Sequence, residues 1–147
     1  MTIEEAIAGL ITANAIVGPV LWDDEEKLHR ISEGVASEDT DAPYVCYFEQ
    51  SDDTGFTLSK RDGNSRATLQ LEVWDKDVDR CRDLASLIKD LLNEFGRGVA
   101  NGVKIKALKA NSAGSDHEDD ESGADVRWYR RIISVQADYE PHTIDSN

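Results

Sequence analysis

Cysteine is scarce in this chain, and its scarcity excludes several classes of protein. Only Cys46 and Cys81 occur among 147 residues, and no Cys-x-x-Cys pair is present. A disulfide framework, a cysteine-bound zinc site or a dithiol redox centre is therefore not expected. Each cysteine falls on a mostly apolar face, one of a predicted strand and one of a predicted helix. We predict two small, buried hydrophobic side chains in a reducing compartment.

Positive charge is also in short supply. Lysine and arginine total 16 against 30 aspartates and glutamates, which gives a formal net charge of −14. Binding to a nucleic-acid backbone depends on clustered positive charge, so we expect no stable nucleic-acid binding. No apolar run is long enough to cross a bilayer, and residues 1–5 do not begin a signal peptide. We therefore expect no membrane association.

Recognisable catalytic motifs are missing as well. The chain has no Gly-x-Ser-x-Gly element, and its three histidines lie in polar surroundings. Gly96 and Gly98 form too short a glycine motif to hold phosphate. His117 stands alone among acids, and the acidic runs lack the spacing of a calcium loop, so no metal site is expected. We predict a protein without enzymatic activity or cofactor; a divalent-metal-dependent enzyme is the weakest alternative.

What is present is the composition of one soluble domain, with 39% hydrophobic and 31% charged residues. Thr2 and Glu5 have the spacing of a capping box and predict a helix over residues 1–13. Asn14 and then Gly18-Pro19 should end this helix and prevent another. A short strand is possible near residues 28–31, before a loop that runs to Asp41.

Residues 43–75 predict strands. Tyr44–Glu49 forms the first strand, residues 51–53 a turn, and residues 54–60 a second strand that leads to a hairpin at Asp62-Gly63. The return strand, Arg66–Asp75, alternates apolar and polar residues, so one face is core and the other is wet or in an interface.

The longest helix is predicted over residues 76–95. Asp75 or Asp77 can cap it, and the two glycines that follow stop it. Its apolar stripe consists of Val78, Cys81, Leu84, Ala85, Ile88, Leu91, Leu92 and Phe95. The order of elements predicts an α+β fold in one domain, residues 1–147, with an antiparallel sheet and two helices packed on one face.

Residues 102–139 predict a strand pair that brackets an acidic loop. A lysine-bearing strand, residues 103–109, precedes the loop, and a strand over residues 126–135 follows it. This concentration of carboxylates is too charged to bury, so it should form a negative surface projection that is open to a partner. The acidic loop contains Asp116, Glu118, Asp119, Asp120, Glu121 and Asp125.

Aromatic and basic residues in the strands predict an interface with another subunit or protein. Tryptophan and arginine are favoured where proteins meet, although the aromatics could instead cover the sheet's own edge or the helix ends. The basic strand region could oppose the acidic loop of an adjacent copy, a head-to-tail arrangement that can build rings. The predicted interface residues are Trp74, Trp128, Arg130, Ile132, Arg127, Lys104 and Lys106.

The same order of features resembles the tail-terminator, or tail-completion, proteins of long-tailed bacteriophages and prophages. The matching features are the amino-terminal helix with its Gly18-Pro19 exit, the run 42–45 that opens a strand, and the strand 66–75 that feeds the helix 78–95. The acidic excursion before Arg130-Arg131, in a strand that ends at Tyr139, matches too. These are loose patterns that cover most of the chain.

The resemblance implies a sheet with flanking helices, no enzymatic activity and no cofactor. It implies a homohexameric ring that caps the tail tube and joins the head, with the tail-tube protein and a head-completion or connector protein as partners. Its place is then the virion tail, and the host cytoplasm during assembly. The acidic stretch 116–125 departs from the family, and in a bore it would let DNA slide. The alternative function is an acidic inhibitor that mimics DNA and occupies a nucleic-acid-binding protein.

Overall fold

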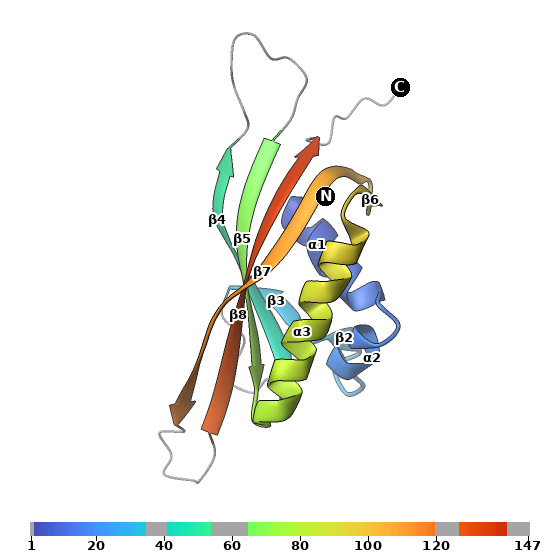
Figure 1. The fold of residues 1–147 in the computed structure, drawn as a ribbon. Coiled ribbons are helices and arrows are strands. Elements are labelled where there is room, and N and C mark those ends of the chain that lie inside the picture. Colours follow the sequence, from blue (N-terminus) through green and yellow to red (C-terminus); the bar gives the residue numbers. More distant parts are fainter. Residues whose placement is uncertain (1, 35–40, 54–64, 120–126, 141–147) are drawn as a thin grey trace.

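Helices cover one face of a mostly antiparallel sheet (Figure 1). The computed structural model describes residues 2–34, 41–53, 65–119 and 127–140. In chain order the elements are α1 (Ile3–Ala13), α2 (Val17–Leu21), β1 (Trp22–Asp23), β2 (Leu28–His29), β3 (Ile31–Glu33), β4 (Tyr44–Asp53), β5 (Ser65–Asp75), α3 (Val78–Phe95), β6 (Gly98–Ala100), β7 (Val103–Asp119) and β8 (Arg127–Glu140). The main sheet has the order β3-β4-β5-β8-β7-β6, and β1 and β2 form a separate small hairpin.

The amino-terminal helix begins as predicted. The hydroxyl of Thr2 accepts a hydrogen bond from the backbone N–H of Glu5, and the Glu5 carboxylate accepts one from the N–H of Thr2, each at 3.1 Å. Our expectation that Gly18-Pro19 would prevent a further helix is wrong, because both residues lie inside α2. Proline is tolerated in the first turn of a helix, where its missing N–H has no partner to lose.

The long helix α3 begins at Asp77, whose carboxylate accepts from two backbone N–H groups of the first turn. Of the two predicted caps, Asp77 is therefore the one used. Gly96 ends the helix with a φ of 62°, a conformation that glycine adopts without steric cost. The buried side chains of the stripe are Cys81, Leu84, Ala85, Ile88 and Leu92. Val78 is 42% exposed and stays outside the core.

Strand β5 follows the predicted alternation and lies at the middle of the sheet. Its odd-numbered residues from Ser65 to Asp75 are buried, and its apolar members join the core with the odd-numbered residues of β8 from Ile133 to Tyr139. Cys46 and Cys81 are both buried and unbridged, so their predicted burial is confirmed. The α+β class, a single antiparallel-rich sheet with helices packed on it, is confirmed too.

Of the local predictions for the first hairpin, the structure tests the turn at residues 51–53 but not the strand and turn that follow it. The turn expected at residues 51–53 is wrong: these residues continue β4 and pair with β5 after a register shift between Glu49 and Ser51. The strand predicted at 54–60 and the turn at Asp62-Gly63 lie outside the described residues. Strand β3 runs parallel to β4, which the sequence pattern did not predict.

Strands β7 and β8 form a long hairpin whose tip extends past the amino-terminal end of α3 (Figure 1). The predicted acidic loop is therefore too long. Asp116, Glu118 and Asp119 lie in β7, opposite Arg130, Trp128 and Arg127 of β8. Asp116 lies opposite Arg130, and opposite charges across a strand pair favour pairing, which explains why the strand continues into the acidic run. Asp120, Glu121 and Asp125 lie outside the described residues.

Candidate interaction surface

The sheet has a second face, opposite the helices, which we call the open face. None of the described helices packs on it (Figure 1). Side chains reach it from the even-numbered positions of β4, β5 and β8, because neighbours in register point to the same side. The described residues of this face include aromatic, arginine and carboxylate side chains instead of a plain solvated polar row.

Three aromatic side chains from three strands meet at one end of the open face. We call Tyr44, Trp74 and Trp128 the aromatic cluster. The rings of Tyr44 and Trp74 are stacked with centroids 6.2 Å apart, and those of Tyr44 and Trp128 are 5.4 Å apart. The ammonium of Lys76 lies 5.0 Å from the Trp128 ring. All three rings are half-buried, so each keeps surface that a partner can cover.

Arg130 lies next to the aromatic cluster and links three strands. Its Nε donates to Asp116 Oδ1 at 2.8 Å, a second nitrogen donates to the other Asp116 oxygen, and Nη1 donates to Glu72 Oε2 at 3.2 Å. Its guanidinium also lies 5.3 Å from the Trp74 ring. Glu72 accepts two more hydrogen bonds, from Gln70 Nε2 at 2.8 Å and Trp74 Nε1 at 3.2 Å.

The pairing of Arg130 with Asp116 shifts the pKa values of both groups toward their charged forms. The hydrogen bond from Arg130 lowers the pKa of Asp116, helped by the charges of Arg130 and His117, although slight burial opposes it. The hydrogen bond to Asp116 in turn raises the pKa of Arg130. Both groups are charged and mutually satisfied at neutral pH. A partner that covered this end of the face would therefore bury a pair, which costs much less than burying a lone charge.

The predicted interface residues divide into two groups. Trp74, Trp128 and Arg130 come together as expected, and Ile132 follows Arg130 by two residues on the same face. Arg127 is the first residue of β8, next to Trp128; it is exposed and has the opposite parity.

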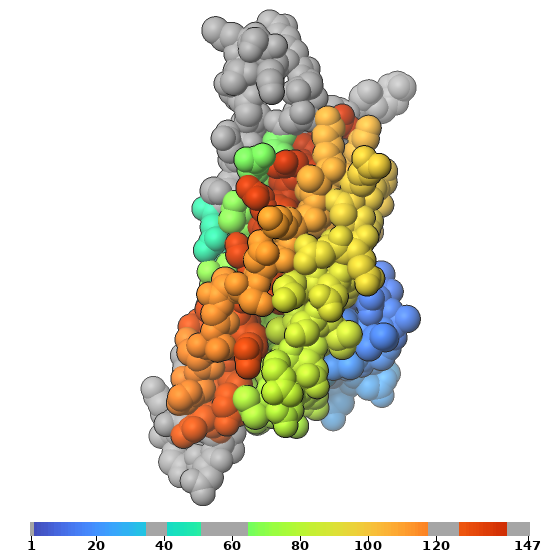
Figure 2. All heavy atoms as spheres, in the orientation of Figure 1, coloured from blue at the N-terminus to red at the C-terminus, as the bar shows by residue number. Residues whose placement is uncertain are grey.

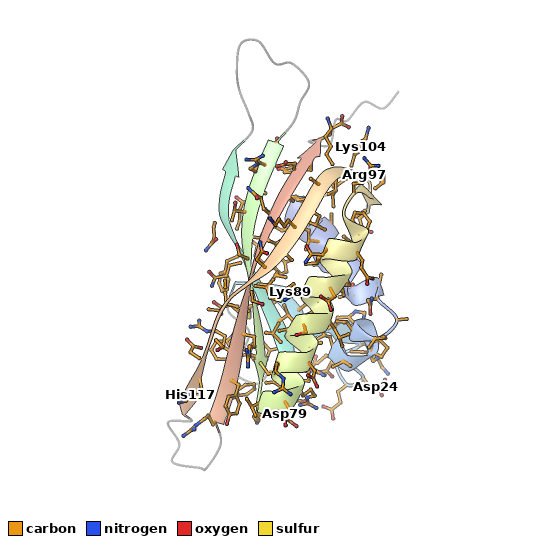
Figure 3. All side chains as sticks on the ribbon, in the orientation of Figure 1. Asp24, Asp79, Lys89, Arg97, Lys104 and His117 are labelled. Carbon is orange, nitrogen blue, oxygen red and sulfur yellow. The ribbon has the colours of Figure 1, made fainter. Side chains whose placement is uncertain are left out.

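Lys104 and Lys106 lie at the other end of the hairpin, where both approach Glu140, at 3.7 and 3.6 Å. Figure 3 shows this separation, with Lys104 and His117 labelled at opposite ends. The basic region is thus spread along the molecule instead of forming one patch.

Sequence reasoning missed Tyr44, Glu72 and Lys76. Tyr44 joins the aromatic cluster only because β4 pairs with β5 in a register that places it opposite Trp74. Glu72 was assigned to the polar side of an alternating strand, but it is only 7% exposed and serves as a hydrogen-bond hub. The alternation along β5 predicts the face to which the Glu72 side chain points. Only the register of the three strands shows its hydrogen-bond partners.

Hollows occur at two places described here. One, of about 510 Å³, is lined by Glu4, Glu33, Gly34, Tyr47, Phe48 and Glu49. The other, of about 170 Å³, lies between α3 and the hairpin and is lined largely by serine, arginine and aliphatic side chains. The described part of the chain holds no group of three or more potential metal ligands. Of the helices described, none is both long and apolar enough to cross a membrane.

No protein-family model and no curated protein matches this chain. A solved structure described as the virion of a native gene transfer agent particle contains a chain of similar fold. The TM-score is 0.55 at 14% sequence identity, over 92% of this chain and 94% of that one. At such low identity the likeness extends to the fold alone.

Proposed function

We propose that this chain is a structural subunit of a phage-like virion. In this role, copies assemble into a ring that caps the tail tube and presents the surface that joins the head. The observation that carries the proposal is the open face: an ordered cluster of aromatic and paired charged side chains that no described helix covers. Aromatic side chains and arginine are enriched at protein–protein interfaces and among the residues that contribute most to binding.

Two further lines support this role. A chain of the gene transfer agent virion shares the fold over almost the full length of both chains. The tail-terminator resemblance rests on the same elements that the structure contains: α1, the strand β5 that feeds α3, and the β7–β8 hairpin. The hexameric ring number and the tail-tube and head-completion partners come from that resemblance alone and are part of the proposal.

The proposed ring would act without converting a substrate. Each subunit supplies shape, a rigid sheet surface and a net charge of −14. If the acidic stretch 116–125 lines the bore, its charge repels the phosphate backbone of passing DNA. DNA is then free to slide, since no counterions are released on a negative surface and binding gains nothing.

The test is to remove the cluster's contact groups without unfolding the subunit. The variant is Trp128→Ala with Arg130→Ala, and the matched control is Trp22→Ala with Arg66→Ala. Trp22 is 40% exposed on the β1–β2 hairpin, and Arg66 pairs with Asp138 at the far end of the open face. We expect the first variant to lose assembly onto tails while its circular dichroism stays that of the wild type. The control should assemble.

Assembly is measured by light scattering after size exclusion over a range of concentrations, and by electron microscopy of tails. Unfolding of the first variant would place these residues in the subunit's own core. Equal assembly of both variants would remove the aromatic cluster from the interface. A wild-type chain that neither forms rings nor joins a tail tube would overturn the proposed function.

The charges of the open face argue against the alternative, an acidic mimic of DNA. A mimic needs unpaired carboxylates spread at phosphate-like spacing over a rigid surface. Asp116 and Glu72 are paired with Arg130, and Asp138 is paired with Arg66 at 2.7 Å. Competition with DNA for a nuclease or repressor would support the alternative, and no competition across a panel of such proteins would count against it.

A further inference from the structure

The two outer strands of the main sheet are each only partly paired. β3 pairs with β4 at Val45 to Tyr47, and beyond Tyr47 no described strand pairs with that edge of β4. β6 pairs with β7 from Val103 to Ile105, and from Lys106 onward no described strand pairs with that edge of β7. We call these two stretches the β4 edge and the β7 edge.

A long unpaired edge is a template for another strand, and soluble proteins normally protect it. The β7 edge is long: every residue from Asn111 to His117 is exposed. Figure 2 shows this strand at the surface beside α3. Within it, Leu108 and Ala110 are the buried positions, because they face α3. At Ala110 the side chain of Asn93 occupies this edge: Asn93 Nδ2 donates to the Ala110 carbonyl at 2.9 Å, and Asn93 Oδ1 accepts from the Ala110 N–H at 2.8 Å. A second strand along this edge would extend the sheet and would replace that one side chain.

The strand directions fit a continuous sheet made of copies. β4 and β8 run one way, and β5 and β7 run the other way, since every pairing from β4 to β7 is antiparallel. Copies related by rotation about an axis close to the strand direction keep these directions. The β4 edge of one copy then meets the β7 edge of the next in antiparallel orientation. Such a head-to-tail contact closes into a ring.

The short outer strands also fix how the copies are offset. β3 occupies the beginning of β4, and β6 occupies the beginning of β7, which lies at the opposite end of the sheet. The two unpaired stretches therefore meet only if neighbouring copies are displaced along the strands. Closing a sheet into a barrel requires this kind of stagger, with the strands tilted to the axis.

Acidic side chains lie at the β4 edge, and lysines flank the first part of the β7 edge, which becomes acidic only from Asp116 onward. The 510 Å³ hollow lies at the β4 edge, and its three carboxylates are Glu4, Glu33 and Glu49. On the same, helix-covered side of the β7 edge, Lys89 of α3 donates to Ser112 at 3.4 Å (Figure 3). Lys109 is exposed on the other side of this edge. Complementary charge of this kind selects the partner and the register of a contact.

We propose that the β4 edge of one copy pairs with the β7 edge of the next, so that the sheets of all copies form one continuous β-ring. Lys89 approaches the carboxylates of Glu33 and Glu49 in the neighbouring copy. This inference rests on the proposed ring and specifies which parts of the subunit join.

Charge reversal at each edge tests the proposal. The acidic-edge variant is Glu33→Lys with Glu49→Lys, and the basic-edge variant is Lys89→Glu. Neither should form rings alone, because each would bring two edges of like charge together. An equimolar mixture should restore rings of alternating variants, as an even-numbered ring allows. Asp24→Lys with Glu25→Lys, on the β1–β2 hairpin, changes the charge as the acidic-edge variant does and should assemble.

Disulfide formation tests the strand contact itself. Gln50 hydrogen-bonds Gln70, and Asn111 pairs with Ser134, so both lie on the open face at their respective edges. Mild oxidation of Gln50→Cys with Asn111→Cys, or with Lys109→Cys for the neighbouring register, should give a ladder of covalent oligomers. The single-cysteine variants are the controls.

The outcomes separate the two proposals. Rings that form in the wild type and in both charge-reversal variants overturn the edge pairing and leave the proposed function standing. Rings without any disulfide ladder do the same, as does a mixture that fails to assemble while the hairpin control succeeds. A wild-type chain that never associates, at any concentration or with tail tubes, overturns both.

Discussion

The strongest test of the physical reasoning concerns Arg80 and the carboxylate that it neutralises. Asp75 ends β5 and has no exposed surface. Its oxygens accept from Arg80 Nε at 2.6 Å and Nη2 at 2.7 Å, and from the backbone N–H groups of Lys76 at 2.7 Å and Asp77 at 3.3 Å. Replacing Arg80 with alanine would leave the two backbone donors but remove the only positive charge paired with this carboxylate in the described structure.

The expected cost follows from the burial of the two partners. Breaking a fully buried ion pair by removing one partner costs about 3–5 kcal/mol. The Arg80 side chain is 49% exposed, so water can reach the site and reduce the penalty. We therefore expect Arg80→Ala to lower the free energy of unfolding by about 2–3 kcal/mol.

Arg82 gives a matched control two residues along the same helix. It pairs with Asp79 at 3.2 Å and Asp83 at 3.6 Å, and the side chains of these partners are 73% and 70% exposed. Exposed pairs contribute little, so Arg82→Ala should cost less than about 1 kcal/mol. Both substitutions exchange arginine for alanine in α3, so the change in helix propensity largely cancels.

Urea unfolding followed by circular dichroism measures both values. Adding Asp75→Asn to Arg80→Ala should recover part of the loss, because the uncompensated charge is then gone. Equal destabilisation by the two arginine substitutions would refute the reasoning. No recovery in the double variant would show that Arg80 acts by packing alone.

Two further predictions follow from the titratable groups. Burial, helped by the charge of Asp75, raises the pKa of the Cys81 thiol to about 11. Both cysteines should therefore react slowly with a thiol reagent in the native state and rapidly in denaturant; fast native reaction would contradict their burial. The pKa of Asp116 is lowered by Arg130, so their pair stabilises the fold above pH 3.8 and is lost as the pH falls through the lower, folded-state pKa. The stability difference between wild type and Asp116→Asn should then shrink in acid; a constant difference would refute the pairing.

Patterns of period and capping were enough to predict most of the fold. The alternation from Arg66 to Asp75 and the stripe of α3 identify the central strand and the covering helix, because burial of one face is a local property of the sequence. The capping box at Thr2 likewise locates the start of α1. Predictions from the local sequence failed where pairing with another strand determined the secondary structure. Residues 51–53 look like a turn, but the ladder with β5 holds them in β4.

The candidate surface was predictable only in part, for a related reason. Trp74, Trp128 and Arg130 were identified from residue type and parity, and the structure places them together. Their common partner Glu72 and the role of Asp116 depend on the registers of β5, β8 and β7, which no single segment encodes. Asp116 looked like one more solvated carboxylate of a loop, and the pairing strand converts it into half of an ion pair.

The hairpin has one more consequence, which concerns angles. Its register shifts, between Ile105 and Ala107 and between Ser112 and Gly114, place extra residues in β7 opposite β8. Bulges of this kind bend a strand and increase its twist, and Figure 1 shows a strongly twisted sheet whose strands overlap in the view near mid-length and fan out on either side. The surfaces of the two halves of the β7–β8 hairpin therefore face in different directions. Substitutions near Gly114 would change the angle between these two halves and leave the other side chains of each half unchanged. The curvature of the sheet and the contacts that its surface makes can therefore vary independently.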